Sequence, residues 1–240
     1  MGTKRICLWS SPRNISTAMM YSFAQRPDTI VFDEPLYAHY LSITKIEHPG
    51  KEEILQSQEQ DGNKVIKEII LGKYAKPIVF FKQMTHHLVQ LNENFLNDVL
   101  NVIFIRDPKQ IISSYAEVRP NVNMQDIGIK KQWKLFNILI SKKSFVVVLD
   151  SNEILKSPEK VLTELCELLK IPFYKEMLYW PAGAKKEDGV WAKYWYENVH
   201  KSTGFATQKT SSRNLPLHLE PLYQESKIYY DKLFKHSIKA

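Results

Sequence analysis

Five short runs of β-branched and aromatic residues alternate along the chain with stretches of helical periodicity. These runs cover residues 6–9, 29–32, 77–81, 101–105 and 145–149. Parallel strands need crossover connections, usually helices, and are then buried on both faces. The alternation therefore predicts an α/β fold, in which a parallel β-sheet of about five strands carries helices on both faces. At 240 residues the chain is long enough for one full core, so we expect a single domain over residues 1–240.

The first run leads through a polar turn at residues 10–14 into a helical stripe that begins near Ile15. A helix that follows a strand in this way points its first N–H groups at the crevice, a place suited to phosphate or sulfate. Ser16 and Thr17 add hydroxyls in the first helical turn, and Arg13 adds a cation. The segment therefore predicts an anion site. The alternative is an ordinary junction whose polar side chains only cap the helix.

This turn is not the phosphate loop of a nucleoside triphosphatase. That motif, G-x-x-x-x-G-K-[ST], requires glycines, and the sequence has no glycine between Gly2 and Gly50. The missing glycines and the missing lysine argue against a nucleotide kinase.

A second strand-like run, 101–105, is followed by Arg106 and by a predicted helix with Asp107 as its N-cap and Pro108 in its first turn. Arg106 then lies at the carboxyl end of a strand, where ligands of open α/β sheets bind. Ser114 follows eight residues later. An arginine fork beside a hydroxyl favours a phosphate monoester, whereas the alternative is an arginine paired with a surface carboxylate.

Together the two elements resemble the nucleotide-binding elements of the sulfotransferases that use 3′-phosphoadenosine 5′-phosphosulfate (PAPS). The resemblance implies that the first loop grips the 5′-phosphosulfate and that the arginine and serine of the second element hold the 3′-phosphate. It covers about residues 4–173, because residues 145–173 resemble the late strand and helix of these enzymes. The residues that carry it are Pro12, Arg13, Asn14, Ile15, Ser16, Thr17, Arg106 and Ser114.

The family resemblance implies transfer of a sulfuryl group from PAPS, without a metal, to a hydroxyl or amine of a small-molecule or saccharide acceptor. Two positions depart from the family pattern, since Arg13 replaces the usual lysine and Ile15 replaces the usual glycine. Arginine is the bulkier cation, and isoleucine limits how closely the backbone approaches a ligand. These departures leave open a second interpretation, a non-catalytic nucleotide-binding module with the same fold.

Asp33 and Glu34 follow the second run and precede a proline. In some sulfotransferases a glutamate in a similar Glu-Pro context acts as the base, and the resemblance assigns that role to Glu34. An acceptor hydroxyl must lose its proton as it attacks sulfur, and a placed carboxylate can take it. Asp33 is expected to face the opposite way, because neighbouring side chains alternate along a strand. Asp33 is also a candidate cap for a helix that starts near Leu36.

Lys82 follows the third run and precedes a Thr-His-His segment. The arrangement resembles the lysine and Thr-His pair that cytosolic sulfotransferases place beside the transferred group, although two extra residues intervene here. We expect Lys82 and Arg13 to offset the charge that develops there. His86 or His87 is an alternative base, an acceptor contact or a hydrogen-bonded helix cap. No metal site is predicted, because the two cysteines are distant and the zinc-protease pattern H-E-x-x-H is missing.

Several later or inserted segments are expected to border the site. The polar stretch 45–72, inserted after a strand end, is predicted to form a helical lid over the acceptor. Residues 191–199 are predicted to form one helix with an aromatic face, and residues 206–218 an exposed loop. A basic loop similar to the one that closes over the nucleotide in sulfotransferases contains Lys201, Ser202, Thr203 and Gly204.

The net charge of +7, from 33 basic and 26 acidic residues, is typical either of a site for anionic ligands or of a nucleic-acid surface. The lysines are scattered and no RNA-binding motif or zinc-finger spacing occurs, so nucleic-acid binding is not favoured. No apolar stretch has membrane length, and the amino terminus lacks the apolar region of a signal peptide. Cys7 and Cys166 lie in apolar contexts and are expected to be packed thiols, which favours a reducing cytoplasm.

Overall fold

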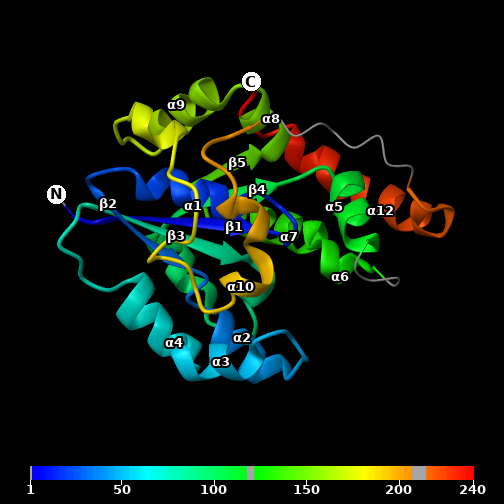
Figure 1. Ribbon diagram of the computed structural model, residues 1–240, viewed down its shortest axis with the longest axis horizontal. Coiled ribbons are helices and arrows are strands. Elements are labelled where there is room, and N and C mark those ends of the chain that lie inside the picture. Colours follow the sequence, from blue (N-terminus) through cyan, green and yellow to red (C-terminus); the bar gives the residue numbers. More distant parts are fainter. Residues whose placement is uncertain (1, 118–121, 207–214) are drawn as a thin grey trace.

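A computed structural model describes residues 2–117, 122–206 and 215–240. Its centre is a five-stranded sheet, parallel throughout, in the order β2-β3-β1-β4-β5 (Figure 1). Each predicted run overlaps one observed strand, and the predicted fold class is confirmed. The strands are β1 (Lys4–Ser10), β2 (Thr29–Asp33), β3 (Ile78–Met84), β4 (Leu100–Ile105) and β5 (Val146–Asp150).

Strand β3 continues beyond the predicted run, to Met84. Its last residues pair in parallel with β1, with Lys82 opposite Leu8 and Met84 opposite Ser10. Lys82 therefore lies within the strand rather than after it, and its side chain is buried. The sequence prediction ended the strand too early, because lysine is rarely buried in a strand unless it is paired.

Helices follow the strands as crossover connections. Asp107 caps the helix after β4, since its side chain accepts a hydrogen bond from the Lys109 N–H and Pro108 occupies the first turn, as predicted. Two short segments of other helical types flank β3, a wider π-helical turn at Ile66–Ile70 and a tighter 3₁₀ turn at Thr85–His87. The α-helices are α1 (Ser16–Ala24), α2 (Tyr37–Thr44), α3 (Lys51–Ser57), α4 (Gly62–Val65), α5 (Pro108–Ala116), α6 (Met124–Ile127), α7 (Ile129–Ser141), α8 (Ser151–Lys156), α9 (Pro158–Leu168), α10 (Ala192–Trp195), α11 (Glu197–His200) and α12 (Glu220–Phe234).

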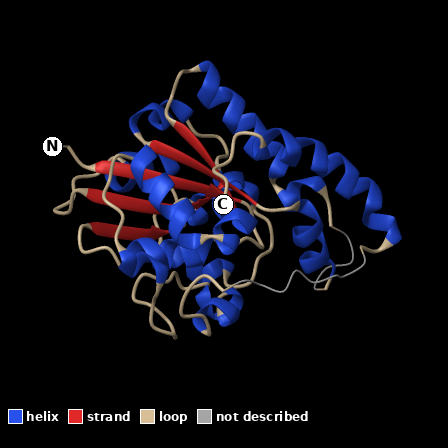
Figure 2. Ribbon diagram, turned by 90° about the horizontal axis from the view of Figure 1, so that it is seen from above, coloured by secondary structure: helices blue, strands red, loops and turns tan. Residues whose placement is uncertain are grey.

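The sheet is covered on both faces, as the continuous apolar runs of its strands require. Side chains of β1 alternate between two apolar clusters, so that Leu8 packs on one face and Trp9 on the other. Helices α1 and α9 cover the first face, and α7 and α12 cover the second (Figure 2). Cys7 and Cys166 are free, buried thiols, as predicted.

Asn101 in β4 is a fully buried polar side chain whose hydrogen bonds all lie inside the protein. Its Nδ2 donates to the carbonyl oxygens of Leu96 (2.8 Å), Val99 (3.2 Å) and Phe145 (3.1 Å), and its Oδ1 accepts from Trp9 Nε1 at 2.9 Å. Replacing Asn101 by alanine leaves these groups unpaired in a dry interior. We therefore expect the free energy of unfolding to fall by about 2–4 kcal/mol in urea titrations.

The matched control for this variant is Asn63→Ala, at an exposed position in α4. Exposed substitutions of this kind change stability by less than about 0.5 kcal/mol. Equal losses in the two variants would show that the interior hydrogen bonds of Asn101 contribute nothing specific.

The inserted segment 45–72 is helical and is interrupted before Gly62, where α4 begins. Its second half is part of the core rather than a separate cover, since Val65, Ile66 and Ile70 belong to the apolar cluster under β1 and β3. Residues 46–49, in the first part of the segment, line the cleft described below, and a lid role for them stays a prediction.

The single helix predicted over 191–199 is wrong. The chain forms two short helices, α10 and α11, which are separated at Tyr196. Trp191 and Tyr196 are buried, whereas the side chains of Tyr194 and Trp195 are 42 % and 43 % exposed. The aromatic residues therefore do not share one buried face. The segment is held by hydrogen bonds of the buried Trp191 and Tyr196 side chains, and not by the packing of one continuous helix.

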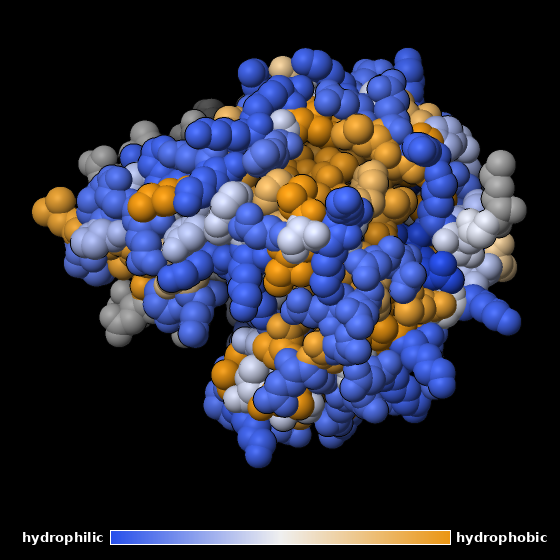
Figure 3. Space-filling view, turned by 180° about the vertical axis from the view of Figure 1, so that it is seen from behind, coloured by the Kyte–Doolittle hydropathy of each residue, from blue (hydrophilic) through white to orange (hydrophobic). Residues whose placement is uncertain are grey.

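The carboxyl-terminal helix predicted from Leu219 onward is present as α12. Residues 207–214, most of the predicted exposed loop at 206–218, lie outside the described residues. Hydrophilic side chains cover most of the face behind that of Figure 1, around one apolar hollow (Figure 3). Within the described parts of the chain, no helix has the length and apolar character needed to cross a membrane.

Candidate active site

The carboxyl ends of the strands open onto a cleft of about 2780 Å³. Its walls are the loop after β1, the first turn of α1, the end of β3, one side of α5 and one side of α7. The segments 44–49 and 191–206 border it. A pocket for one small ligand usually measures roughly 300–1,000 Å³, so this cleft has room for a nucleotide and a second molecule. The predicted anion-site residues of the first loop all line it, namely Pro12, Arg13, Asn14, Ile15, Ser16 and Thr17.

The loop between β1 and α1 is held in place by Asn14. Its Nδ2 donates to the Phe104 carbonyl oxygen of β4 at 3.1 Å, and its Oδ1 accepts from the Ile15 N–H at 2.8 Å. Arg13 has a φ of 57°, in the left-handed region that costs energy for residues other than glycine. Helix α1 begins at Ser16, and its first N–H groups have no carbonyl partner within the helix. The loop thus presents backbone donors and a cation to the cleft.

Arg106 and Ser114, predicted from a separate segment, lie against the same loop. Arg106 Nη1 donates to the Arg13 carbonyl oxygen at 2.6 Å, and Arg106 Nε donates to Gln110 Oε1 at 2.9 Å. Arg13 Nε donates to Ser114 Oγ at 3.0 Å. Burial, together with the neighbouring Arg13 cation, lowers the pKa of Arg106. An anion bound between the two guanidinium groups relieves this repulsion.

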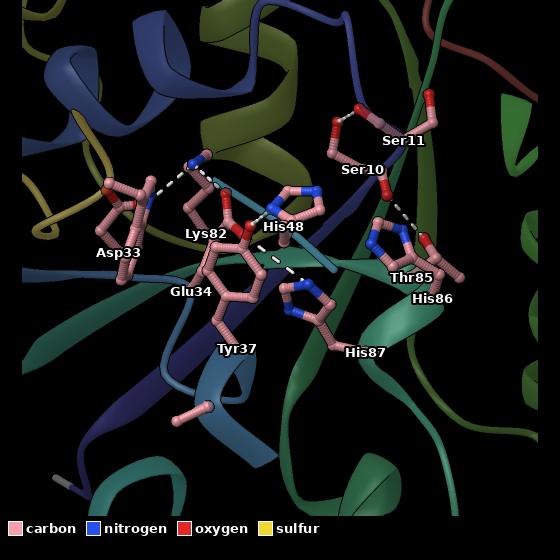
Figure 4. A network of polar contacts seen from close by, with 12 residues as sticks. Ser10, Ser11, Asp33, Glu34, Tyr37, His48, Lys82, Thr85, His86 and His87 are labelled. Atoms are coloured by element: carbon pink, nitrogen blue, oxygen red, sulfur yellow. Dashed lines mark hydrogen bonds and ion pairs between the residues drawn. The ribbon is translucent and has the colours of Figure 1, made fainter. Parts of the chain in front are cut away.

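A second polar cluster lies at the ends of β2 and β3 (Figure 4). Lys82 Nζ donates to Asp33 Oδ1 at 2.7 Å, to Glu34 Oε1 at 2.5 Å and to the Tyr196 hydroxyl oxygen at 2.5 Å. All four side chains are buried. Burial favours the neutral amine, but the Asp33 and Glu34 carboxylates outweigh it and raise the pKa of Lys82 well above its ordinary value. Lys82 is therefore a charged lysine between two acids.

Glu34 has the properties of a base near neutral pH. Burial raises its pKa from an ordinary 4.5 to about 6, the Lys82 cation opposes this shift, and the Asp33 carboxylate adds to it. Glu34 also lines the cleft. A carboxylate in this range is ionised at pH 7 and still basic enough to accept a proton from a reacting group.

The prediction that Asp33 and Glu34 face opposite ways is wrong, since both contact Lys82. Strand β2 ends at Asp33, and Glu34 has a φ of 42°, so the alternation of an extended strand no longer applies. The capping role considered for Asp33 is also wrong. Helix α2 begins at Tyr37 with Leu36 as its N-cap, and no side chain caps it.

His87 lies beside Glu34, and the His86 ring contacts the His87 ring edge-on at 4.6 Å. His87 Nε2 is 3.8 Å from Glu34 Oε2, and its ring stacks on Tyr37 and Tyr40 with centroid distances of 4.8 Å each. Burial lowers the pKa of His86 to about 3 and that of His87 well below its ordinary value. Both histidines are therefore neutral, and His87 contributes a flat ring to the wall next to the carboxylate.

Tyr196 was not among the predicted residues. Its hydroxyl donates to Asp33 Oδ2 at 2.7 Å and accepts from Trp191 Nε1 at 3.1 Å, in addition to its bond with Lys82. The aromatic content of its segment was visible in the sequence. No local spacing relates that segment to residue 33, which is 163 positions away.

The late basic loop reaches the cleft only in part. Ser202 and Gly204 line it, and the Ser202 hydroxyl accepts from Trp180 Nε1 at 3.0 Å. Lys201 pairs at the surface with Glu197 at 2.6 Å, and the Thr203 carbonyl accepts from the Trp180 N–H. A role for this loop in nucleotide binding stays a prediction.

The two clusters share one cleft, and the chain that builds it matches a known family model. The model of the sulfotransferase domain covers residues 4–231, almost the whole chain. The chain belongs to the sulfotransferase domain family. The resemblance drawn from the sequence is thereby confirmed.

This sulfotransferase domain also has curated relatives in Arabidopsis thaliana. It is 39 % identical over 223 residues to branched-chain-amino-acid aminotransferase-like protein 2, and 38 % identical over 229 residues to branched-chain-amino-acid aminotransferase-like protein 1. The matches cover 92 % and 95 % of this chain but 40 % and 41 % of those proteins. The chain thus spans about two fifths of the length of these relatives, whose names describe the whole proteins.

Solved structures of low identity share the fold of this sulfotransferase domain. The sulfotransferase domain of the Synechococcus PCC 7002 olefin synthase has a TM-score of 0.59 at 14 % identity, with 96 % of each chain covered. The sulfotransferase domain of the curacin biosynthetic pathway has a TM-score of 0.57 at 15 % identity, covering 97 % of this chain and 98 % of its own. A mouse sulfotransferase complexed with PAP has a TM-score of 0.50 at 13 % identity, covering 97 % and 83 %.

Proposed function

We propose that the domain transfers a sulfuryl group from PAPS to a hydroxyl or amine of an acceptor molecule. The observation that carries the proposal is the shared cleft, in which the Glu34 carboxylate and an anion cradle formed by Arg13, Arg106 and Ser114 open to the same space. A carboxylate that takes a proton and cations that hold a phosphosulfate are the two functions that sulfuryl transfer requires. Membership of the sulfotransferase domain family supports the same reaction.

In the proposed reaction Glu34 takes the proton of the acceptor hydroxyl as its oxygen bonds to sulfur. The bond between sulfur and the phosphate oxygen breaks at the same time, and its electron pair stays with the phosphate. Arg13 and the first N–H groups of α1, at Ser16 and Thr17, stabilise the phosphate that leaves. Arg106 and Ser114 hold the 3′-phosphate and so orient the nucleotide. The products are the sulfated acceptor, 3′-phosphoadenosine 5′-phosphate (PAP) and a proton on Glu34.

Calorimetric binding of PAP, with AMP as the ligand that lacks the 3′-phosphate, tests the proposed nucleotide site. We expect PAP to bind at least about tenfold more tightly than AMP, because two charge-assisted hydrogen bonds to the 3′-phosphate are lost with AMP. No binding of either nucleotide would overturn the proposal.

A non-catalytic nucleotide-binding module is the second candidate. One contact favours it, because the Ile15 N–H, at the position where the family usually has glycine, donates to its neighbour Asn14 and not toward the cleft. Such a protein would bind PAP and show no turnover with any acceptor. A panel of phenol, saccharide and amine acceptors, with release of PAP as the readout, separates the two candidates.

The pH dependence of turnover is expected to identify the base. Glu34 acts as a carboxylate, so kcat/KM should fall as the pH decreases through about 6, the pKa to which burial raises this group. Burial lowers the pKa of His86 to about 3 and that of His87 well below its ordinary value, so we expect neither histidine to produce this decrease in rate. Initial rates between about pH 5 and 8 measure this profile. A flat profile in that interval would exclude Glu34.

We further propose that the first part of the 45–72 segment covers the acceptor. His48 and Trp195 both line the cleft, and their rings lie 5.5 Å apart across its mouth. Trp195→Ala removes one side of this contact and should raise the KM of the acceptor roughly 2- to 10-fold, while the Kd of PAP stays unchanged. An unchanged KM, or an equal loss of PAP affinity, would contradict the lid.

A further inference from the structure

The ammonium group of Lys82 has three N–H donors, and each of them already has an acceptor inside the protein. We propose that Lys82, held by Asp33 and Tyr196, is a positioning residue that fixes one oxygen of Glu34, and that it does not contact the transferred sulfuryl group. This inference rests on the proposed function, because it assigns the part that Lys82 plays beside the base. It replaces the role in charge neutralisation that the sequence suggested for Lys82.

Lys82 has no N–H donor left for a further acceptor. The three acceptors, Asp33 Oδ1, Glu34 Oε1 and the Tyr196 hydroxyl oxygen, lie 2.5–2.7 Å from Nζ, and the Lys82 side chain is 1 % exposed. A sulfuryl oxygen could bond to Nζ only by displacing one of these acceptors. The displaced oxygen would then be buried without a donor, which is costly.

Tyr196 and Asp33 are themselves held by further hydrogen bonds, so the position of the Lys82 ammonium group is fixed. The Tyr196 hydroxyl accepts from Lys82 and from Trp191 Nε1, and it donates to Asp33 Oδ2. Asp33 Oδ2 accepts a further hydrogen bond from the Gly189 N–H at 3.1 Å. The segment 189–196 therefore anchors Lys82 and Asp33 through hydrogen bonds that do not involve Glu34.

The two carboxylate oxygens of Glu34 consequently differ in their hydrogen bonding. Oε1 is bound by Lys82, whereas among the described residues Oε2 has no donor within hydrogen-bonding distance, and His87 Nε2 lies 3.8 Å from it. Oε2 is therefore the atom that accepts the proton when the O–H bond of the acceptor breaks. The charged and titratable groups that face Glu34 are Asp33 from β2, Lys82 from β3, Tyr37 from α2, His87 from the 3₁₀ turn and Tyr196 before α11.

The first arm of the test compares PAPS with PAP by calorimetry in the wild type and in Lys82→Met. The two ligands differ by the sulfuryl group alone. A lysine that positions Glu34 leaves the ratio of the two Kd values within about twofold of the wild type. A selective loss for PAPS of about tenfold or more would overturn the inference, because that is the loss of one charge-assisted contact.

The second arm needs no substrate and follows the titration of Glu34 itself. In protein labelled with ¹³C at the glutamate carboxyl carbon, the Glu34 signal is the one that disappears in Glu34→Gln. Lys82→Met removes a neighbouring cation and should move the midpoint of this signal up by roughly one pH unit or more. Asp33→Asn removes a neighbouring anion and should move it down. Unchanged midpoints would overturn the inference.

Two variants are used because one of them, Lys82→Met, could fail to fold. Lys82→Met leaves two buried acids without their cation, whereas Asp33→Asn keeps the cation and nearly the same shape, so either variant that folds gives a directional result. Failure of both nucleotides to bind the wild type would overturn the proposed function, and with it the catalytic meaning of the cluster. The titration arm would still report whether Lys82 holds Glu34.

Discussion

Glu34→Gln is expected to lower sulfuryl transfer by about 10²- to 10⁴-fold, the usual contribution of a general base. Glutamine keeps the size of the side chain and an oxygen for the Lys82 hydrogen bond, but an amide cannot accept the proton of the acceptor. The nucleotide contacts of Arg13 and Arg106 come from other elements, so the Kd of PAP should change by less than about twofold. Turnover with a responsive acceptor and calorimetry with PAP measure the two quantities.

The matched control for this variant is Glu47→Gln. Glu47 also lines the cleft, but its side chain is 90 % exposed and pairs with Lys51 at the surface. We expect this change to leave turnover within about twofold, because exposed ion pairs contribute little. Retained activity in Glu34→Gln would transfer the role of base to His87, whose Nε2 lies 3.8 Å from Glu34 Oε2.

Arg106→Ala is expected to weaken PAP binding by about 10- to 100-fold and to leave AMP binding nearly unchanged. The guanidinium group donates to the Arg13 carbonyl oxygen at 2.6 Å, and Arg13 in turn donates to Ser114 Oγ at 3.0 Å. Alanine removes the bidentate donor that matches a phosphate monoester. Calorimetry of the variant with both nucleotides gives the selectivity directly.

Lys109→Ala is the control for Arg106, since it removes a cation from the same helix, α5, at an exposed position. A general loss of positive charge would weaken both nucleotides equally in both variants. If Arg106→Ala lost affinity for PAP and AMP to the same extent, Arg106 would act on the shape of the Arg13 loop and not on the 3′-phosphate.

Much of the fold could be predicted, because the signals that define it are local. The strand around Trp9 is a continuous apolar run, and the helix at Pro108 has an N-cap and a proline in the expected order. The loop after β1 could be placed at the cleft for the same reason, since its hydroxyls and cation follow one strand directly, and anion binding there stays a prediction. The end of β3 was placed too early at the buried Lys82, whose partners come from other parts of the chain.

The arrangement of Asp33, Glu34, Lys82 and Tyr196 could be predicted only in part, because it depends on tertiary contacts. Glu34 was identified from its neighbours in the sequence, but its left-handed backbone, which brings it to the same cation as Asp33, has no local signal. Tyr196 lies in a segment whose aromatic spacing suggested a helix, and its buried hydrogen bonds to Asp33 and Lys82 outweighed that preference. Long-range pairing of this kind cannot be read from periodicity.

Strand β2, which leads to Glu34, is an edge strand of the described sheet and pairs with β3. A strand supported from one side can slip along its neighbour, and a slip of one residue exchanges its two faces. Asp33 lies directly opposite Lys82 in the register, and the Glu34 N–H donates to the Lys82 carbonyl oxygen at 2.8 Å. Any slip would leave the buried Lys82 cation without the Asp33 and Glu34 carboxylates, which is strongly unfavourable. The ion cluster to which we assign the base therefore also fixes the alignment of this edge strand.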